Sequence, residues 1–332
     1  MLQTALVAMP HFCGMGPEQR RDGVTFTNLD EPLFAEAQAT KRELVGYLEA
    51  VADRMIADLR DRPLSVIRAL RDQRPFMQKN TPGYAPAWVR TVKLWAETSR
   101  REVAYPLCND RRTLMWFANQ RAVEYHPALV SAAGLAHPMY LVLDLDPPSA
   151  DGFSAAVQAA HLVRQVLADA HLLGAVKTSG AKGVHVFVPV AEAGNDEVAA
   201  TTRALAARVE RLDPSLATTA FLKEERGGKV FIDSTRVGWA TVVSAYSPRL
   251  RPGVPVSFPV AWEDLDRIAP MDFAIHTAAG LVSGRDPWAD QMPSPQVLPL
   301  DLIDEGRGIP VARVQAMHEG RRRARSRRTD GG

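Results

Sequence analysis

Apolar residues recur at two different spacings along this 332-residue chain, and together they predict a fold that mixes helices and strands. A helical spacing after Thr40 predicts a long amphipathic helix whose buried face carries Leu44, Tyr47, Leu48, Val51 and Met55. Helices are also expected after Asn109-Asp110, over 154–173 with Gly174 closing it, and over 196–212. Strands are expected in GVTFT, PLSVIRALRD, REVAYP, VEYHP, LVLDLD, the runs flanking SGAKG, KVFID, and parts of WATVVSAYSPRLRPGVPVSFPVAWEDL.

The most informative of these strands is LVLDLDPP, where an apolar run ends in two aspartates. Asp144 and Asp146 are two residues apart, so a strand projects both carboxylates from the same face. Paired carboxylates repel each other unless a cation lies between them, and hard oxygen ligands suit Mg²⁺ or Mn²⁺ better than zinc. The alternative is that the aspartates only open a turn before Pro147, since Asp-Pro is a common turn dipeptide.

Two further segments strengthen the metal interpretation. SGAKG is a glycine-rich, basic turn between two predicted strands, in which Ser179 and Lys182 offer a hydroxyl and a charge to an anion. KVFID delivers a third aspartate, Asp233, at the end of another strand. Three strand-end aspartates beside a phosphate-type turn are the arrangement that two-metal phosphoryl transfer requires. A glycine-rich turn alone is usually just a hairpin loop.

Composition narrows the class of protein to which the chain can belong. Hydrophobic residues make up 46% and charged residues 23%, as in ordinary globular domains. Two isolated cysteines indicate a reduced, cytoplasmic setting, and the apolar N-terminal MLQTALVAMPHF is too short to span a membrane. We expect an irregular lead-in at 1–22, a main unit at 23–300 that divides near 130 into an N-terminal module and a catalytic core, and an extension at 301–332.

Charge is unevenly distributed. The net charge is +2, but residues 321–332 hold six arginines and one aspartate, so the rest of the chain carries a net charge of −3. A nucleic-acid site in the body must therefore be a local basic patch. The tail is predicted to be a disordered arm that touches phosphates, or alternatively a solvated end without a role.

A second candidate surface is the segment 74–95, which mixes aromatic, proline and basic residues. Rings on which bases stack and cations that pair with phosphates are what a single-strand or template-contacting loop needs, and Lys79 is one such cation. The alternative is a proline-stiffened loop whose aromatic residues pack inward. Similarly, His126 before a proline is more often a packed residue than a ligand.

Taken together, the chain resembles the polymerase domain of bacterial ligase D, within the archaeo-eukaryotic primase superfamily. The matching stretches, in family order, are TNLD, TKRELVGYL, PFMQKN, YAPAWVRTV, NDRRTLMWFAN, VEYHP, HPMYLVLDLDPP, KTSGAKGVHVFVPV, VFID and AYSPRLRPGVPVSFPVAWEDL. The resemblance implies an α+β fold with an RRM-like catalytic sheet and an accessory N-terminal α/β module. It also implies a nucleotidyltransferase that fills gaps in DNA during non-homologous end joining.

The resemblance also assigns roles to residues. Asp144, Asp146 and Asp233 are expected to hold two Mn²⁺ or Mg²⁺ ions for phosphoryl transfer. The residues expected to contact the incoming triphosphate are His126, Ser179, Lys182, His185 and Arg249. Phe76 and Met77 match residues that press on the template strand, with Lys79 beside them as a DNA contact.

Other matches concern the 5′-phosphate of the downstream strand. Asn28 and Lys41 match two of the three family residues that bind it, but Glu31 stands where a second lysine is expected and would repel a phosphate. VFIDSTR also lacks the tryptophan and asparagine that usually follow the third aspartate. The chain has no ligase motif, so the resemblance implies cooperation with a separate DNA ligase and an end-binding protein.

Three functions follow as hypotheses. The leading one is a DNA-dependent primase-polymerase that adds NTPs in preference to dNTPs at DNA ends and short gaps. The second is a non-catalytic module that binds or bridges DNA ends, motivated by Glu31 and by the altered surroundings of Asp233. The third is a phosphatase whose nucleophile lies in the DxD motif, which Pro147-Pro148 disfavours.

Overall fold

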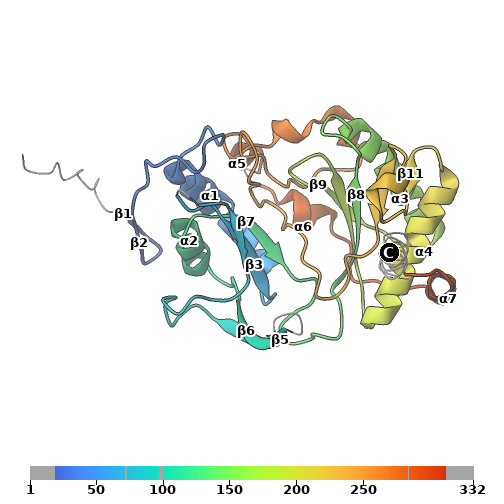
Figure 1. Cartoon of the computed structure of the whole chain (residues 1–332), viewed down its shortest axis with the longest axis horizontal. Coiled ribbons are helices and arrows are strands. Elements are labelled where there is room, and N and C mark those ends of the chain that lie inside the picture. The colour runs from blue at the N-terminus through green and yellow to red at the C-terminus, as the bar shows by residue number, and fades with distance from the viewer. Residues whose placement is uncertain (1–18, 72, 97–99, 283, 312–332) are drawn as a thin grey trace, which may run out of the picture.

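The largest sheet of the computed structural model, which describes residues 19–71, 73–96, 100–282 and 284–311, has five strands (Figure 1). In spatial order its strands are β11 (Ala217–Thr218), β12 (Val230–Asp233), β8 (Tyr140–Asp146), β10 (Val184–Pro189) and β9 (Ala175–Thr178). The central strand β8 pairs antiparallel with both β10 and β12. The predicted aspartate strand therefore lies in the middle of the sheet, where neighbouring strands bring side chains to it from both sides.

Helices α3 (Phe153–Asp169) and α4 (Asn195–Leu212) cover one face of this sheet (Figure 1). Leu141, Leu143 and Leu145 of β8 are fully buried, and they alternate with the aspartates as strand geometry requires. A further helix, α7 (Leu300–Gly308), packs on α4 so closely that a Cβ atom at Gly306 would lie 1.8 Å from the carbonyl oxygen of Ala200. The expected extension from 301 onward thus begins inside a helix that packs on the core.

The N-terminal module is built on helices α1 (Lys41–Leu59) and α2 (Arg111–Asn119), which pack together. Thr40 caps α1 in a capping box with Glu43, and the five residues predicted for its inner face are all buried. The module's strands are β1 (Gln19–Arg21), β2 (Val24–Phe26), β3 (Leu64–Arg68), β4 (Phe76–Gln78), β5 (Thr91–Ala96), β6 (Arg101–Pro106) and β7 (Ala122–Pro127). They form a three-stranded sheet in the order β4-β3-β7 and two hairpins, β1–β2 and β5–β6.

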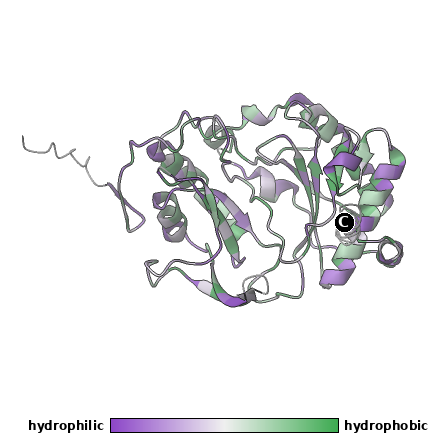
Figure 2. Ribbon diagram, in the orientation of Figure 1, coloured by the Kyte–Doolittle hydropathy of each residue, from purple (hydrophilic) through white to green (hydrophobic). Residues whose placement is uncertain are grey.

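One continuous set of buried apolar residues runs through both parts of the chain. Figure 2 shows hydrophobic ribbon in the strands between the helices and hydrophilic ribbon on outer turns of the helices. Smaller elements complete the shell: α5 (Ala278–Leu281), α6 (Pro287–Gln291) and 3-10 turns at Lys223–Glu225, Leu265–Arg267 and Pro270–Asp272. Within the described residues, no helix is both long and apolar enough to cross a membrane.

Several predictions about local structure were wrong. Helix α3 ends at Asp169, and His171 adopts the left-handed conformation after it; Gly174 instead lies where a Cβ would crowd Phe187 and Val186. Gln19–Arg21, expected in the irregular lead-in, form a strand. The strand-like segments over 239–265 form isolated bridges rather than strands, because prolines interrupt the ladder. Residues 1–18 and the arginine tail lie outside the described residues.

Candidate active site

Strand register brings four polar residues into one row across the sheet. Asp144 on β8 lies opposite Asp233 on β12 and opposite His185 on β10, and His185 in turn lies opposite Lys177 on β9. Residues paired in this way across antiparallel strands project from the same face. The row lies on the face of β8 opposite the buried leucines, so the two sides of one strand serve the core and the site.

Asp146 lies two residues beyond this row and faces basic side chains. Lys182 Nζ is 3.1 Å from Asp146 Oδ1, and Arg226 NH1 is 3.5 Å from Oδ2. Lys182 comes from the SGAKG turn, where Gly180 has φ +67° and a Cβ at Gly183 would lie 2.4 Å from Leu145 O. Glycine is therefore required at Gly183 to bring the turn against β8, and at Gly180 because of its backbone conformation and its close approach to the backbone of Val256 and Ser257.

Ser179 organises the same turn. Its hydroxyl accepts hydrogen bonds from the backbone N–H groups of Gly183 (3.0 Å) and Ala181 (3.2 Å). Arg249 donates to the backbone carbonyl of Ser179. The turn is thus held by its own serine from within and by an arginine from a distant loop.

These residues line a cavity of about 390 Å³, which we call the aspartate cavity. Its charged lining consists of three carboxylates, from Asp144, Asp146 and Asp233, and six cations, from Lys182, Lys223, Arg226, Arg236, Arg249 and Arg251. Ser179 and His185 also line it. Because cations outnumber carboxylates two to one, the aspartate cavity suits a multiply charged anion such as a phosphate chain.

The oxygens that a metal ion would need are engaged by an arginine. Arg236 Nε lies 3.1 Å from Asp233 Oδ2 and 3.8 Å from Asp144 Oδ2. The other oxygen of Asp233, Oδ1, accepts from the backbone N–H and hydroxyl of Thr235. Among the described residues, no three His, Cys, Asp or Glu side chains are arranged to hold a metal ion. The carboxylate donor set still fits a hard divalent cation, and the guanidinium stands as a cation between two of its members.

Protonation in the row is set by burial and neighbouring charge. Burial opposes the charged form of Asp144, but His185 and Arg236 outweigh it and hold its pKa at about 2. Burial, with the nearby charge of Lys177, lowers the pKa of His185 to about 4. Burial likewise lowers the pKa of Lys177 to about 7. The carboxylate is therefore charged and the imidazole neutral at neutral pH.

Lys177 was not predicted as a functional residue, although it contacts one. It is completely buried, and its Nζ lies 2.9 Å from His185 Nδ1 and donates to Ser257 Oγ at 2.6 Å. With Nδ1 occupied by Lys177, the Nε2 atom of His185 faces Asp144 Oδ1 at 3.4 Å. The only sequence signal was a lysine directly after two apolar residues in a short strand.

Glu124 was also missed by the sequence analysis. Its Oε2 lies 2.8 Å from His126 Nε2 and 3.1 Å from Arg249 Nε, and its Oε1 accepts from the N–H of Leu250. Burial raises the pKa of Glu124, but His126 and Arg249 together lower it to about 2. Glu124 thus joins two residues predicted to contact the triphosphate. The available signal was the i, i+2 spacing of Glu124 and His126 in VEYHP.

Phe76, Met77 and Lys79 line a separate cavity of about 1010 Å³, which we call the aromatic cavity. Phe76 is 39% exposed and Met77 43% exposed, so neither packs inward as the alternative for this loop required. Trp95 of β5 and Trp239 of the loop after β12 line it as well. Arg236 lines both this cavity and the aspartate cavity, so the two adjoin.

The remaining predicted DNA contacts, Asn28 and Lys41, lie in neither cavity. Asn28 is exposed, with a φ of +53°. Lys41 is 3% exposed, and its Nζ donates to Thr27 O (2.6 Å) and Asn119 Oδ1 (2.7 Å). Burial lowers the pKa of Lys41 to about 8. The ammonium is thus satisfied internally, and its contact with a phosphate stays a prediction.

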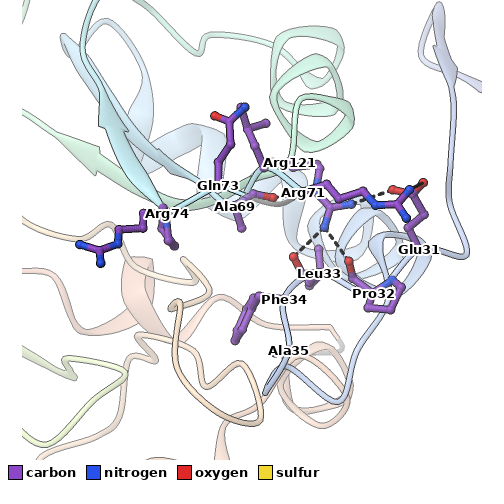
Figure 3. A pocket seen from close by; sticks show the side chains of 12 residues that line it. Glu31, Pro32, Leu33, Phe34, Ala35, Ala69, Arg71, Gln73, Arg74 and Arg121 are labelled. Atoms are coloured by element: carbon purple, nitrogen blue, oxygen red, sulfur yellow. Dashed lines mark hydrogen bonds and ion pairs between the residues drawn. The ribbon is translucent and has the colours of Figure 1, made fainter.

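Glu31 lines a third cavity, of about 710 Å³, which we call the Glu31 cavity (Figure 3). Its carboxylate lies 3.4 Å from Arg121 NH1 and 3.6 Å from Arg71 NH1. Arg121 also donates to the carbonyl oxygens of Pro32 and Leu33. Figure 3 shows Arg74 extending away from this group, on the other side of Phe34. The carboxylate of Glu31 is therefore paired with two arginines.

Comparison with known proteins was made for sequence and for structure. The family model "LigD, primase-polymerase domain" matches residues 40–288. The bifunctional non-homologous end joining protein LigD of Bacillus subtilis is 30% identical over 285 residues, covering 84% of this chain and 46% of that protein. The multifunctional LigD of Mycobacterium bovis is 32% identical over 265 residues, covering 76% of this chain and 34% of that protein. The chain thus spans less than half the length of these curated relatives.

A solved structure gives the same result. The polymerase domain of Mycobacterium tuberculosis ligase D, in complex with DNA, superposes with a TM-score of 0.72 at 28% identity. The match covers 81% of this chain and 99% of that domain. The predicted α+β fold of the archaeo-eukaryotic primase type is therefore confirmed.

Proposed function

Because the chain belongs to the LigD primase-polymerase domain family, whose members are DNA-directed nucleotidyltransferases, we propose that it extends DNA strands at short gaps and broken ends during non-homologous end joining. The observation that carries the proposal is the aspartate cavity: three strand-end carboxylates and six cations beside a glycine-rich turn. Nucleotidyl transfer needs carboxylates to hold divalent cations and basic groups to hold a triphosphate.

The basic groups of the aspartate cavity would bind the incoming nucleotide. Lys182 belongs to the SGAKG turn and Arg249 contacts the turn from a distant loop, and both line the aspartate cavity. They would bind the triphosphate together with the Ser179 turn and the neutral imidazole of His185. His126 would act on the triphosphate indirectly, because Glu124 links it to Arg249. NTPs are the expected substrates in preference to dNTPs.

The carboxylates account for the metal. Asp144, Asp146 and Asp233 would hold two Mn²⁺ or Mg²⁺ ions, through oxygens that now face Arg236, Lys182 and Arg226. Divalent ions bound there would activate the primer 3′-hydroxyl and neutralise the leaving pyrophosphate. Asp144 is poised for this role because its carboxylate stays charged at any pH near neutrality.

The aromatic cavity accounts for the DNA. Phe76 and Met77 present partly exposed apolar surface on which template bases would stack, and Lys79 adds a cation for the backbone. Because this cavity adjoins the aspartate cavity, a strand lying in it would place its end close to the three aspartates. A separate DNA ligase and an end-binding protein would complete the repair.

Primer extension on gapped DNA tests the proposal. The duplex carries a labelled primer and a downstream strand with or without a 5′-phosphate, and Mn²⁺ is supplied with NTPs or dNTPs. Templated addition that is faster with NTPs is expected. Tight DNA binding with no addition under any condition would overturn it.

That overturning result would favour the second candidate function, a non-catalytic module that binds or bridges DNA ends. The observation behind it is the engagement of Asp144 and Asp233 by Arg236, which leaves these carboxylates without a ready-made metal position. A protein that bridges two labelled DNA ends yet adds no nucleotide would establish this function.

A further inference from the structure

Arg236 has a position that neither the core nor the nucleotide explains. It lies in the loop that follows β12, and its side chain is 42% exposed. Its Nε faces one oxygen from each of two aspartates that strand register holds opposite each other. An exposed arginine gains little from packing, so its place is set by the two carboxylates.

The oxygens that Arg236 engages are the ones a metal ion would need. Asp233 Oδ1 already accepts two hydrogen bonds from Thr235, and Asp144 Oδ1 faces His185. The two Oδ2 atoms are the pair left with no partner but the guanidinium among the described residues, and a shared cation would use them. A divalent ion and Arg236 therefore compete for the same pair of oxygens.

A second position is open to the side chain of Arg236. It lines the aromatic cavity as well as the aspartate cavity, so its side chain can leave the carboxylates without entering the core. In the aromatic cavity it would meet the phosphates of a bound DNA strand, which pair with guanidinium in a bidentate manner. The two positions offer the same cation two anionic partners.

We propose that Arg236 is an exchangeable cation that couples DNA binding to metal binding. Without DNA it neutralises Asp144 and Asp233 and opposes the metal ion; with DNA in the aromatic cavity it moves to a backbone phosphate and releases the two oxygens. The inference rests on the proposed function, since it assumes both ligands. It follows by linkage that each ligand raises the affinity for the other by the same factor.

The test measures Mn²⁺ binding by electron paramagnetic resonance in the absence of nucleotide, so that no chemistry occurs. The full chain is titrated alone and with gapped DNA, and Mn²⁺ bound by the DNA itself is subtracted. For the wild-type protein, DNA is expected to tighten Mn²⁺ binding about tenfold, and Mn²⁺ to tighten DNA binding by the same factor. Equal Mn²⁺ affinity with and without DNA would overturn the inference without any variant.

Variants then assign the coupling to the arginine. Arg236→Gln should bind Mn²⁺ without DNA as tightly as the wild-type protein does with DNA, and DNA should add nothing further. Arg236→Ala should behave in the same way, and thermal unfolding checks that both fold. The matched control is Arg101→Gln, which removes a cation from the aromatic cavity on β6 and should weaken DNA binding while keeping the coupling.

Three outcomes separate this inference from the proposed function. Coupling that survives unchanged in Arg236→Gln, or weaker Mn²⁺ binding by that variant without DNA, overturns the inference while templated extension by the wild-type protein keeps the proposed function. Absence of both Mn²⁺ binding and extension in the wild-type protein overturns both.

Discussion

The aspartate cavity and the Glu31 cavity both combine carboxylates with arginines, yet they differ in what fixes the side chains. In the aspartate cavity, adjacent strands hold the acids in register, and six cations face three carboxylates. In the Glu31 cavity, one carboxylate meets Arg121 and Arg71, and Arg121 is tied to two backbone carbonyls of the same loop. An acid-arginine pair can thus be part of a ligand site or a structural link.

The difference lies in the alternatives that each side chain has. Arg121 has its donors committed to the protein, so moving it would leave backbone carbonyls unpaired. Within the part of the chain that the structure describes, Arg236 pairs with the carboxylates of Asp144 and Asp233, and it borders an open cavity. An arginine that, among the described residues, is paired only with strand-held carboxylates and borders an open cavity, rather than cavity volume or the presence of ion pairs, therefore marks the aspartate cavity as the place for a ligand.

The largest expected effect is on primer extension, after a substitution in the aspartate cavity. Asp144→Asn keeps the shape of the side chain but removes the charge, so extension of a gapped primer should fall on the order of a thousandfold or more. The protein should stay folded, but its melting temperature should fall by a few degrees, because the fold favours the ionised form of Asp144. Asp151→Asn, on the exposed turn after β8, is the matched control and should extend normally. Extension by Asp144→Asn at a tenth of the wild-type rate would remove this aspartate from the site.

The next effect concerns Glu124, the buried carboxylate behind the aspartate cavity. Its folded-state pKa of about 2 lies below the ordinary value of 4.5, so its charge stabilises the folded protein above pH 4.5 and this contribution is lost as the pH falls toward 2. Glu124→Gln should lower the free energy of unfolding at pH 7 by about 3 kcal/mol, because it leaves the charge of Arg249 without its partner. The difference from the wild-type protein should shrink between pH 4.5 and 2.

Urea unfolding at pH 7 and at pH 3 measures this difference. The control is Glu192→Gln, an exposed glutamate whose replacement should change the free energy of unfolding by less than about 0.5 kcal/mol at either pH. A gap between Glu124→Gln and the wild-type protein that stayed constant with pH would show that the carboxylate charge is not what stabilises this cluster.

Sequence reasoning reached the aspartates because strand alternation is strictly local. The i, i+2 spacing of Asp144 and Asp146 fixes their common face, which local strand geometry alone determines. The family comparisons confirm the fold and the class of enzyme that these motifs indicated. Roles of individual residues in metal, nucleotide and DNA binding stay predictions.

What the sequence could not supply were contacts between distant segments. Glu31 looked like a repulsive charge because it stands where a lysine is expected; Arg121, which pairs with it, reaches it only through the fold. Lys177 and Ser257 meet because a loop without regular strands returns to β9. Burial of a lysine or glutamate is a tertiary property, so neither Lys177 nor Glu124 stood out by residue type alone.

The smallest expected effect returns to the Glu31 cavity. Glu31→Lys supplies the cation that the family resemblance leads one to expect, beside Arg121 and Arg71. Losing a partly exposed ion pair should cost about 1 kcal/mol or less in stability. Affinity for gapped DNA with a 5′-phosphate should rise about tenfold relative to the same DNA without it, since one added phosphate contact contributes on that scale.

Glu36→Lys distinguishes a specific phosphate contact from a general gain in charge. It makes the same change of charge in the same exposed loop but does not line the Glu31 cavity, so it should strengthen binding of both DNAs equally. Fluorescence anisotropy at one fixed salt concentration measures the ratio. Equal ratios for the two variants would mean that the Glu31 cavity is only a structural link. A selective gain for Glu31→Lys would mean that the fold keeps a phosphate position here, which the wild-type glutamate blocks.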